Sequence, residues 1–565
     1  MKKTFSLLFV IILYASTVFS QSLPRMFHFS DDSLRLIRGG VESTGLYDEY
    51  VIDTIWLSFS QPNYWQLLTS NYNSQTNIPA TLVYKGATFD SVGVRFRGMT
   101  SYFFVQGQKK SFNIELDWVH NDQHIEGYET LKLLNSYGDP SILREALYLK
   151  YSREHIASAR GNHVQLFIND QNWGIYVNVQ KFDRKHVKEW FVDADATRWR
   201  AEKVGGGGGF GAGKSSLNWL GWDTTTYKQY YQIKKYYKPN PWDDLVNTCY
   251  VLNNTPSNLL MDSLANYLDI DGSLWFLAHE ILFTDDDSYI EKGGMDYYLY
   301  FDVGSNRMIP IEYDGNSCMS VQKASQWSPF YKENNTAYPL MNKLMAVPEI
   351  RQRYLAHIRT LMETTFDLPV IQGLIDDWAA RISTNVQNDP KKIYSFTQFQ
   401  SELSKLKQFC STRRNFILNN TEVNRTGPAI SNVIYSVEGQ NFIKPDPFQP
   451  VDITANVTAT QGVHKVILYY GTGLIGKFTR VEMFDDGNHN DGVAGDGIYG
   501  AQIPAHASNQ WVRFYIEALA NDTWKTAKYE PQGAEHDVYI YQVKPGQILD
   551  SPVSSNELLS NDVSP

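Results

Sequence analysis

The sequence predicts an α+β protein followed by an all-β sandwich of immunoglobulin-like type. Residues 21–425 divide into a strand-rich first part, with apolar residues at alternate positions, and a part beyond Tyr227 in which apolar residues recur at helical spacing. Residues 428–545 contain short alternating runs separated by turn residues, which is typical of a β-sandwich. A chain of 565 residues is too long for one core, so roughly two to four domains are expected.

The composition is that of an ordinary folded protein, and the chain has no excess of Lys and Arg over Asp and Glu. The chain is 42% hydrophobic and 20% charged, and its net charge is −10, so nucleic acid is not an expected partner. Its three cysteines, Cys249, Cys318 and Cys410, are far apart in the sequence and match neither a disulfide framework nor a zinc-binding pattern. The fold must therefore be stabilised by packed cores.

Residues 1–20 have the pattern of a secretory signal peptide. Lys2 and Lys3 precede the apolar run FSLLFVIILY, and small residues lead to Ser20, the expected cleavage position. The alternative, a membrane anchor, requires a longer apolar core. We expect a secreted or cell-surface protein with no membrane span after cleavage, and a polar, serine-rich tail at residues 546–565.

A loop between two predicted strands near Arg97 has features of a phosphate-binding site. The strand ending in RFRG is followed by the loop MTSYFFVQGQ and by the strand KKSFNIELD, which starts with Lys109 and Lys110. Backbone N–H groups of such a loop and a lysine ammonium both favour bound phosphate. A lysine at the start of a strand is also common as a solvated edge residue, so both interpretations stay open.

A helix is predicted next, with Asp139 as its N-cap and Pro140 at its first position. The apolar residues from Ile142 to Leu149 fit one face of this helix. Glu145 lies within the same helix. It is either a surface acid or the partner of a strand lysine.

The segment Gly208–Ser215, GGFGAGKS, matches the phosphate-loop pattern of nucleotide-binding proteins. That motif needs a buried strand before it and a helix after it. Here the preceding run, RWRAEKVGGG, is polar, and the following run, SLNWLGWDTTTY, lacks helical spacing. We therefore expect residues 204–216 to form a flexible loop.

Carboxylates gather at both ends of the stretch from Leu268 to Met319. The run LDIDGSLWFLAHEILF has helical spacing, while DYYLYFD and IPIEYDGNSCM are predicted strands joined by the turn VGSNRM. The loop after the helix contains Asp285, Asp286 and Asp287. The end of the second strand contains Glu312 and Asp314. A hairpin can bring such distant acids into one cavity, which would suit divalent cations and phosphoryl chemistry.

The predicted sandwich contains an acidic loop, DDGNHNDGVAGDG, from Asp485 to Gly497. Aspartates among glycines and asparagines are typical of calcium sites, so bound Ca²⁺ is one expectation. A long polar hairpin loop without a metal is the other.

Several runs resemble the CotH family of spore-coat kinase-like proteins. They are RFRGMTS with KKSFNIELD, LKLLN with DPSILREAL, HVQLFINDQNWGIYV, YLDIDGSLWFLAHEILFTDDDS, and DYYLYFD with RMIPIEYDGNS. Each run is weakly specific alone, but their shared order over residues 45–420 makes the resemblance specific. The C-terminal sandwich is similar to a module often attached to such proteins.

The resemblance implies an atypical bilobal protein-kinase-like fold for residues 21–425, with a strand-rich N-lobe and a helix-rich C-lobe. It implies ATP and Mg²⁺ or Mn²⁺ as cofactors. Lys109, rather than its neighbour Lys110, would contact the nucleotide. Arg97 would help to hold the phosphates, and Glu145 would pair with the lysine.

The same resemblance assigns roles to the acids. Asp287 would be the catalytic base or a metal ligand, and Asp314 would hold the metal on the nucleotide phosphates. Glu312 stands where the family usually has an aspartate, and remains a possible ligand. Two positions depart from the family pattern: Asp296 replaces an asparagine at a candidate metal position, and Gln180 replaces a glutamate near the expected hinge.

The expected function is that of an exported protein kinase that transfers the γ-phosphate of ATP to Ser or Thr of secreted or surface proteins. One alternative is a catalytically inactive cell-surface scaffold or adhesin with the sandwich as its binding module. Another is a calcium-dependent protein that binds or processes glycans, but no paired carboxylates on a glycosidase framework are recognisable.

Overall fold

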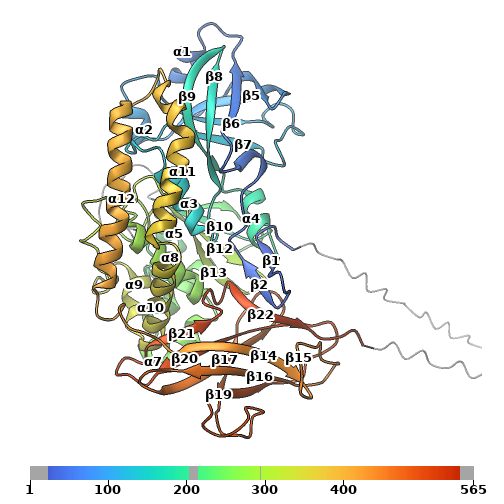
Figure 1. The fold of residues 1–565 in the computed structure, drawn as a ribbon. Helices are drawn as coiled ribbons and strands as arrows, with labels where there is room; N and C mark the ends of the chain where they lie inside the picture. The colour runs from blue at the N-terminus through green and yellow to red at the C-terminus, as the bar shows by residue number, and fades with distance from the viewer. Residues whose placement is uncertain (1–22, 203–213, 293, 547–565) are drawn as a thin grey trace, which may run out of the picture.

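The computed structural model describes residues 23–202, 214–292 and 294–546. It stacks a β-barrel, a helical region and a β-sandwich along one axis (Figure 1). This arrangement of helices and sheets confirms the predicted α+β class with an immunoglobulin-like C-terminal part.

Some predictions fall outside the described residues. These are the signal peptide at residues 1–20, most of the glycine-rich segment Gly208–Ser215, and nearly all of the tail at residues 546–565. Among the helices in the described ranges, none has both the length and the apolar composition that a membrane crossing requires.

A closed barrel forms the first layer, in the strand order β3-β4-β5-β6-β7-β9-β8. Its strands are β3 (Asp53–Ser58), β4 (Ile78–Tyr84), β5 (Ala87–Arg97), β6 (Ser111–Glu115), β7 (Thr130–Leu134), β8 (Gly161–Ile168) and β9 (Gln171–Gln180). Parallel pairing of β3 with β8 closes the barrel, and every other pair of neighbouring barrel strands is antiparallel. Alternate apolar residues fill its interior, which is why the sequence has period two here.

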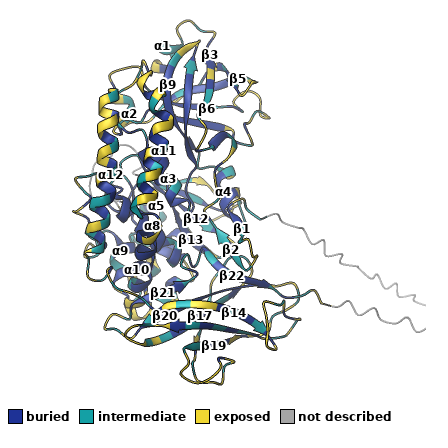
Figure 2. Ribbon diagram, in the orientation of Figure 1, coloured by how far each residue is buried: buried dark blue, intermediate teal, exposed yellow. Residues whose placement is uncertain are grey.

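The helical region is built around α8 (Ile270–Phe283), which is buried on nearly every side (Figure 2). The Asp269 carboxylate caps this helix by accepting a hydrogen bond from the Gly272 N–H at 3.3 Å. Thr284, in the left-handed conformation with φ of 52°, ends it. The predicted helix is therefore confirmed, and the acidic loop starts directly after it.

Helices α3 (Arg144–Ser152), α6 (Asp243–Asn254), α7 (Ser257–Leu264), α9 (Pro339–Met345) and α10 (Pro348–Glu363) lie in the same region. The long helices α11 (Leu368–Gln387) and α12 (Phe396–Leu418) run beside it and reach the level of the barrel (Figure 1). The short helices are η1 (Gly45–Tyr47), α1 (Tyr64–Ser70), α2 (Thr100–Phe103), α4 (Arg184–Trp190) and α5 (Thr224–Tyr227).

The predicted start of α3 is wrong. Asp139 does not cap the helix, because its carboxylate accepts hydrogen bonds from the N–H groups of Ser141 and Arg144 and pairs with the Arg144 guanidinium. These bonds close a turn, so the helix begins at Arg144 and places Glu145 in its first turn.

A four-stranded sheet in the order β11-β10-β12-β13 lies below the barrel. Its strands are β10 (Arg198–Ala201), β11 (Tyr231–Lys235), β12 (Tyr297–Asp302) and β13 (Arg307–Ile311). Strands β12 and β13 are the predicted hairpin, with Tyr298 opposite Ile311. The acid loop before β12 and the segment after β13 therefore meet at the same end of this hairpin.

The sandwich brings together strands from the beginning and the end of the described chain. Its larger sheet has the order β1-β2-β22-β20-β17-β18, with β21 beside β20, and its smaller sheet has the order β15-β14-β16-β19. Strands β1 (Phe27–Phe29) and β2 (Arg35–Arg38) extend the larger sheet, because β2 pairs with β22. The expected boundary near residue 428 thus omits the N-terminal strands that complete the sandwich.

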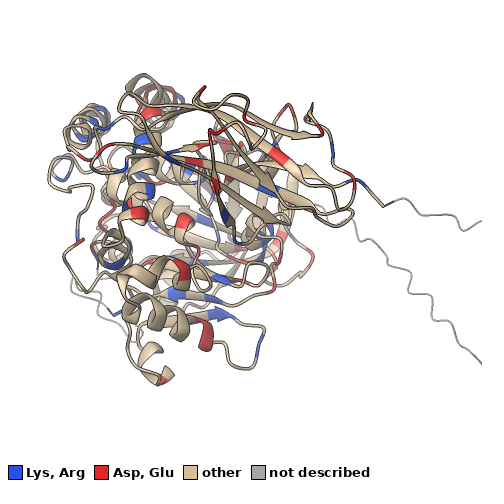
Figure 3. Ribbon diagram, turned by 90° about the horizontal axis from the view of Figure 1, so that it is seen from below, with Lys and Arg blue, Asp and Glu red and all other residues tan. Residues whose placement is uncertain are grey.

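The other sandwich strands are β14 (Ala429–Val437), β15 (Gln440–Asn441), β16 (Val451–Thr458), β17 (Val463–Thr472), β18 (Thr479–Met483), β19 (Ile498–Ile503), β20 (Trp511–Ala520), β21 (Ala527–Glu530) and β22 (Asp537–Gln542). Seen from the sandwich end, basic and acidic residues are interspersed along the described chain (Figure 3).

Candidate functional site

A cleft of about 480 Å³ lies between the barrel and the helical region. Its walls come from the loop after β5, strands β6, β7, β9 and β10, helix α3, the acid loop after α8 and the segment after β13. Its charged side chains are Arg97, Lys132, Asp139, Glu145, Arg200, Asp287, Lys292, Asp296 and Asp314. Leu134, Val177 and Val179 provide an apolar wall.

The cleft brings together most of the predicted site residues. Arg97, Glu145, Asp287, Asp296 and Asp314 all line it, although they come from four separate segments of the chain. The predicted convergence of distant carboxylates with a basic side chain is therefore present.

Lys109 does not line the cleft. Its side chain is 3% exposed, and its Nζ lies 2.7 Å from Asp389 Oδ2 and donates to the Trp173 carbonyl at 2.7 Å. The predicted pairing with Glu145 is therefore wrong. Lys109 precedes β6, outside the strand alternation, and the buried acid that pairs with it comes from the loop between α11 and α12.

Lys110 also makes structural contacts. Its Nζ donates hydrogen bonds to the carbonyls of Tyr102 and Val105 at 2.7 Å and 2.6 Å. These bonds hold α2 and the loop after it against the start of β6. Lys110 is not among the residues that line the cleft.

The buried lysine of the cleft is Lys132 in β7, which sequence reasoning missed. Its neighbours Leu131 and Leu133 point into the barrel core, so Lys132 faces the opposite side. It is 8% exposed and has no ion-pair partner in the described ranges. Burial and the nearby charge of Arg97 lower its pKa well below the usual value. The sequence signal that could have identified Lys132 is its position between Leu131 and Leu133 in an alternating strand, which places the lysine on the face opposite the core leucines.

Glu145 and Asp314 form a pair of acids within the cleft. Glu145 is 5% exposed, and its Oε2 atom has no hydrogen-bond partner in the described chain. Burial raises the pKa of Glu145 well above its usual value, and the charge of Asp314 and a hydrogen bond with it act in the same direction. A shared proton or a bound cation would relieve the repulsion between two such acids.

Asp287 and Asp296 share a cation instead. Lys292 forms ion pairs with both, and Arg200 pairs with Asp296 at 2.8 Å. Burial raises the pKa of Asp287 to about 6 despite the opposing effect of Lys292. For Asp296 the charges of Lys292 and Arg200 outweigh burial and lower the pKa.

Glu312 lies behind the cleft and does not line it. It is 2% exposed and accepts a hydrogen bond from the Tyr148 hydroxyl at 2.8 Å. Burial raises the pKa of Glu312 to about 8. Gln180, the other departure from the family pattern, donates to Glu189 at 3.0 Å and is also absent from the cleft lining.

The carboxylates of the cleft fit a divalent cation only in part. Across the described residues, no three Asp, Glu, His or Cys side chains are arranged as ligands of one ion. Mg²⁺ commonly takes one or two carboxylates and completes its shell with water and substrate phosphates. Glu145, with its unpartnered Oε2 atom, and Asp314 suit that mode of binding.

The acidic loop of the sandwich uses its carboxylates internally. Asp491 accepts hydrogen bonds from the N–H groups of Asp486, Gly487 and His489. Asp485 accepts from two glycine N–H groups across the loop. These contacts agree with a polar hairpin loop, and the expected Ca²⁺ stays a prediction.

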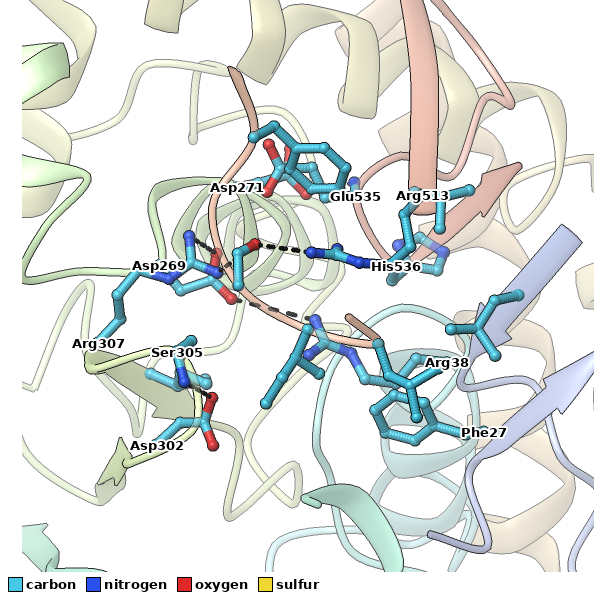
Figure 4. Close-up of a pocket in the computed structure, with 17 residues that line it drawn as sticks. Phe27, Arg38, Asp269, Asp271, Asp302, Ser305, Arg307, Arg513, Glu535 and His536 are labelled. Carbon is cyan, nitrogen blue, oxygen red and sulfur yellow. Dashed lines mark hydrogen bonds and ion pairs between the residues drawn. The ribbon is translucent and has the colours of Figure 1, made fainter. Parts of the chain in front are cut away.

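A second, much smaller cavity of about 30 Å³ lies where the helical region meets the sandwich (Figure 4). Its charges pair with one another: Asp269 contacts Arg307 at 3.6 Å and Arg38 at 4.0 Å. The Glu535 N–H donates to Asp271 at 2.8 Å. We interpret this cavity as part of a polar junction that holds the sandwich in place.

Comparison with known proteins agrees with the resemblance noted in the sequence. The profile of the CotH kinase protein family matches residues 94–417, which is more than half of the chain and includes the cleft residues from Arg97 to Asp314. The profile of the conditioned medium factor second Ig-like domain matches residues 472–516. No curated protein matches the chain. The protein is therefore a member of the CotH kinase protein family that carries a C-terminal immunoglobulin-like domain.

Proposed function

We propose that this protein is an exported, ATP-dependent protein kinase with a bilobal kinase-like arrangement, in which the barrel is the N-lobe and the helical region the C-lobe. Its substrates would be Ser or Thr hydroxyls of secreted or surface proteins. The observation that supports this proposal is that Lys132 and Arg97 line one cleft together with Glu145, Asp287 and Asp314. Phosphoryl transfer depends mainly on positioning and charge neutralisation.

The nucleotide would bind with its base against the apolar wall formed by Leu134, Val177 and Val179. Lys132 and Arg97 have no ion-pair partner in the described part of the chain, so both are available for phosphates. Glu145 and Asp314 would hold Mg²⁺ or Mn²⁺, which neutralises phosphate charge when bound.

Asp287 would act as the base. It accepts the proton of the acceptor hydroxyl, whose oxygen bonds to the γ-phosphorus as the bond from that phosphorus to the β–γ bridging oxygen breaks, and ADP leaves. Its pKa of about 6 leaves the carboxylate ionised near neutral pH, as a general base requires.

A second candidate is an inactive cell-surface scaffold with the sandwich as its binding module. The observation that favours it is that Asp296 is paired with Arg200 and Lys292, so its carboxylate is not free for a metal.

The test uses the mature protein from residue 21. We expect a thermal shift with ATP and Mn²⁺, and transfer of labelled phosphate from ATP to casein or to the protein itself. Asp287→Asn and Asp314→Ala should lose transfer. Equal labelling by all three proteins would refute the assignment, and the absence of a thermal shift with ATP and Mn²⁺ would favour the scaffold.

A further inference from the structure

Lys292 is held between two carboxylates of the cleft. Its Nζ lies 2.7 Å from Asp296 Oδ2 and forms an ion pair with Asp287 Oδ1. The other oxygen of Asp296 pairs with Arg200 at 2.8 Å. All four side chains line the cleft. The Lys292 ammonium therefore occupies the position of a cation that bridges Asp287 and Asp296.

The cleft thus contains two pairs of acids with different partners. Asp287 and Asp296 have Lys292 and Arg200 beside them, so two negative charges face two positive charges. Glu145 and Asp314 face each other without an ion pair in the described chain. Of the two pairs, only Glu145 and Asp314 lack an ion pair with a cationic side chain in the described chain, so they are the pair left to attract a divalent ion.

The first half of the acid loop that carries Lys292 is held by hydrogen bonds. The Glu280 carboxylate in α8 accepts hydrogen bonds from the N–H groups of Tyr289 and Ile290 at 3.0 Å and 2.8 Å. Asp285 accepts from the Asp287 N–H at 3.2 Å. These bonds hold residues 285–290 of the loop against α8, and Asp287 and Lys292 both line the cleft.

We propose that Lys292 replaces a second metal ion: the site binds one divalent cation, on Glu145 and Asp314, and the Lys292 ammonium supplies the second positive charge to the transferred phosphoryl group. This inference rests on the proposed kinase function. An ammonium has three N–H donors. With two of them directed to Asp287 and Asp296, the third is available to a phosphoryl oxygen.

The charge of Lys292 is stable in this environment. Burial alone lowers the pKa of Lys292, but the charges of Asp296 and Asp287 outweigh burial and raise the pKa above its usual value. Protein kinases commonly use two Mg²⁺ ions to neutralise the phosphates. A tethered ammonium between two acids provides part of that neutralisation without a second ion.

The experiment measures how many Mn²⁺ ions bind in the presence of a non-hydrolysable ATP analogue, by titration calorimetry and electron paramagnetic resonance. We expect one ion per chain for the wild type and for Lys292→Arg. Lys292→Met should bind a second ion at Asp287 and Asp296, because Asp287 loses its cation and Asp296 keeps only Arg200. Its kcat for transfer should fall about 100-fold, and should partly recover at high Mn²⁺ concentration.

Lys323→Met is the matched control. Lys323 pairs with Asp286 of the same loop, and its side chain is 26% exposed compared with 23% for Lys292. Lys323 does not line the cleft. This variant should therefore bind one Mn²⁺ ion and keep the kcat of the wild type.

The outcomes separate the two proposals. Two Mn²⁺ ions in the wild type, or a Lys292→Met protein with one ion and unchanged kcat, would overturn the role of Lys292 while the kinase function stands. A wild-type protein that binds neither the analogue nor Mn²⁺ would overturn the proposed function itself, and the role of Lys292 with it.

Discussion

The Nζ atom of Lys109 lies 2.7 Å from Oδ2 of Asp389, and the two side chains are 3% and 2% exposed. This buried ion pair joins the start of β6 in the barrel to the loop between α11 and α12. The Lys109 ammonium also lies 3.9 Å from the centroid of the Tyr176 ring. The contacts indicate that Lys109 fixes the barrel against the helical region, and we expect it to take no part in nucleotide binding.

Lys109→Met should therefore destabilise the protein without weakening nucleotide binding. Removing one partner of a buried ion pair costs about 3–5 kcal/mol, because Asp389 would remain buried without its cation. Chemical unfolding and ATP titration of the folded variant check the two effects separately. A normal unfolding free energy together with lost ATP affinity would restore Lys109 as the nucleotide lysine.

Lys132→Met should have the opposite effect. We expect ATP affinity to fall at least about 30-fold, because losing a buried charged contact costs about 2 kcal/mol or more. Stability should be unchanged or higher, since burial lowers the pKa of Lys132 and works against its charged form.

Calorimetry in buffers of different ionisation enthalpy adds a second measurement. Phosphates stabilise the charged lysine, so ATP binding by the wild type should take up protons, and Lys132→Met should lose that uptake. An identical proton uptake in both proteins would contradict this role.

Asp287 should determine the acidic limb of the activity profile. A base must be ionised to accept a proton, so kcat should fall as pH drops through about 6, the pKa of Asp287. Asp287→Asn should lower kcat by about 100-fold to 10,000-fold with little change in ATP affinity. Asp286→Asn, in the same loop, is the control. A pH-independent kcat between pH 5 and pH 8 would rule out Asp287 as the base.

His186 should make the fold sensitive to acid. Burial lowers the pKa of His186 to about 3, whereas the unfolded value is near 6.5. The unfolded state therefore binds the proton first, and stability is lost as pH falls from about 6.5 towards 3, by up to about 1.4 kcal/mol per pH unit.

The matched variant is His186→Asn, which cannot be protonated and keeps a polar group near Gln180, whose Oε1 lies 3.3 Å from His186 Nδ1. The unfolding free energies of the two proteins should diverge below pH 6.5. Parallel curves down to pH 4 would show that His186 does not contribute.

Local sequence patterns predicted the elements that carry the site. Helix α8, the hairpin of β12 and β13 and most strands of the sandwich were predicted, because an element that is buried on one or both faces has apolar residues at regular spacing in the sequence. The family resemblance identified the acids that meet in the cleft. Asp287 and Asp314 lie shortly after α8 and β13, two elements whose ends can be predicted from the sequence.

The sequence by itself therefore determined the fold class, the family and the convergence of Asp287 and Asp314, but not the place of Glu312 outside the cleft. Only the tertiary structure decided which lysine faces these acids, because Lys109 lies just before β6 and Lys132 lies in the neighbouring β7, and the directions of both side chains depend on barrel closure. It also decided that Asp389 pairs with Lys109, and that β2 completes a sheet with β22. These contacts join residues that are hundreds of positions apart in the sequence. They form because the whole fold buries both partners together, and the local spacing of apolar residues contains no information about such pairs.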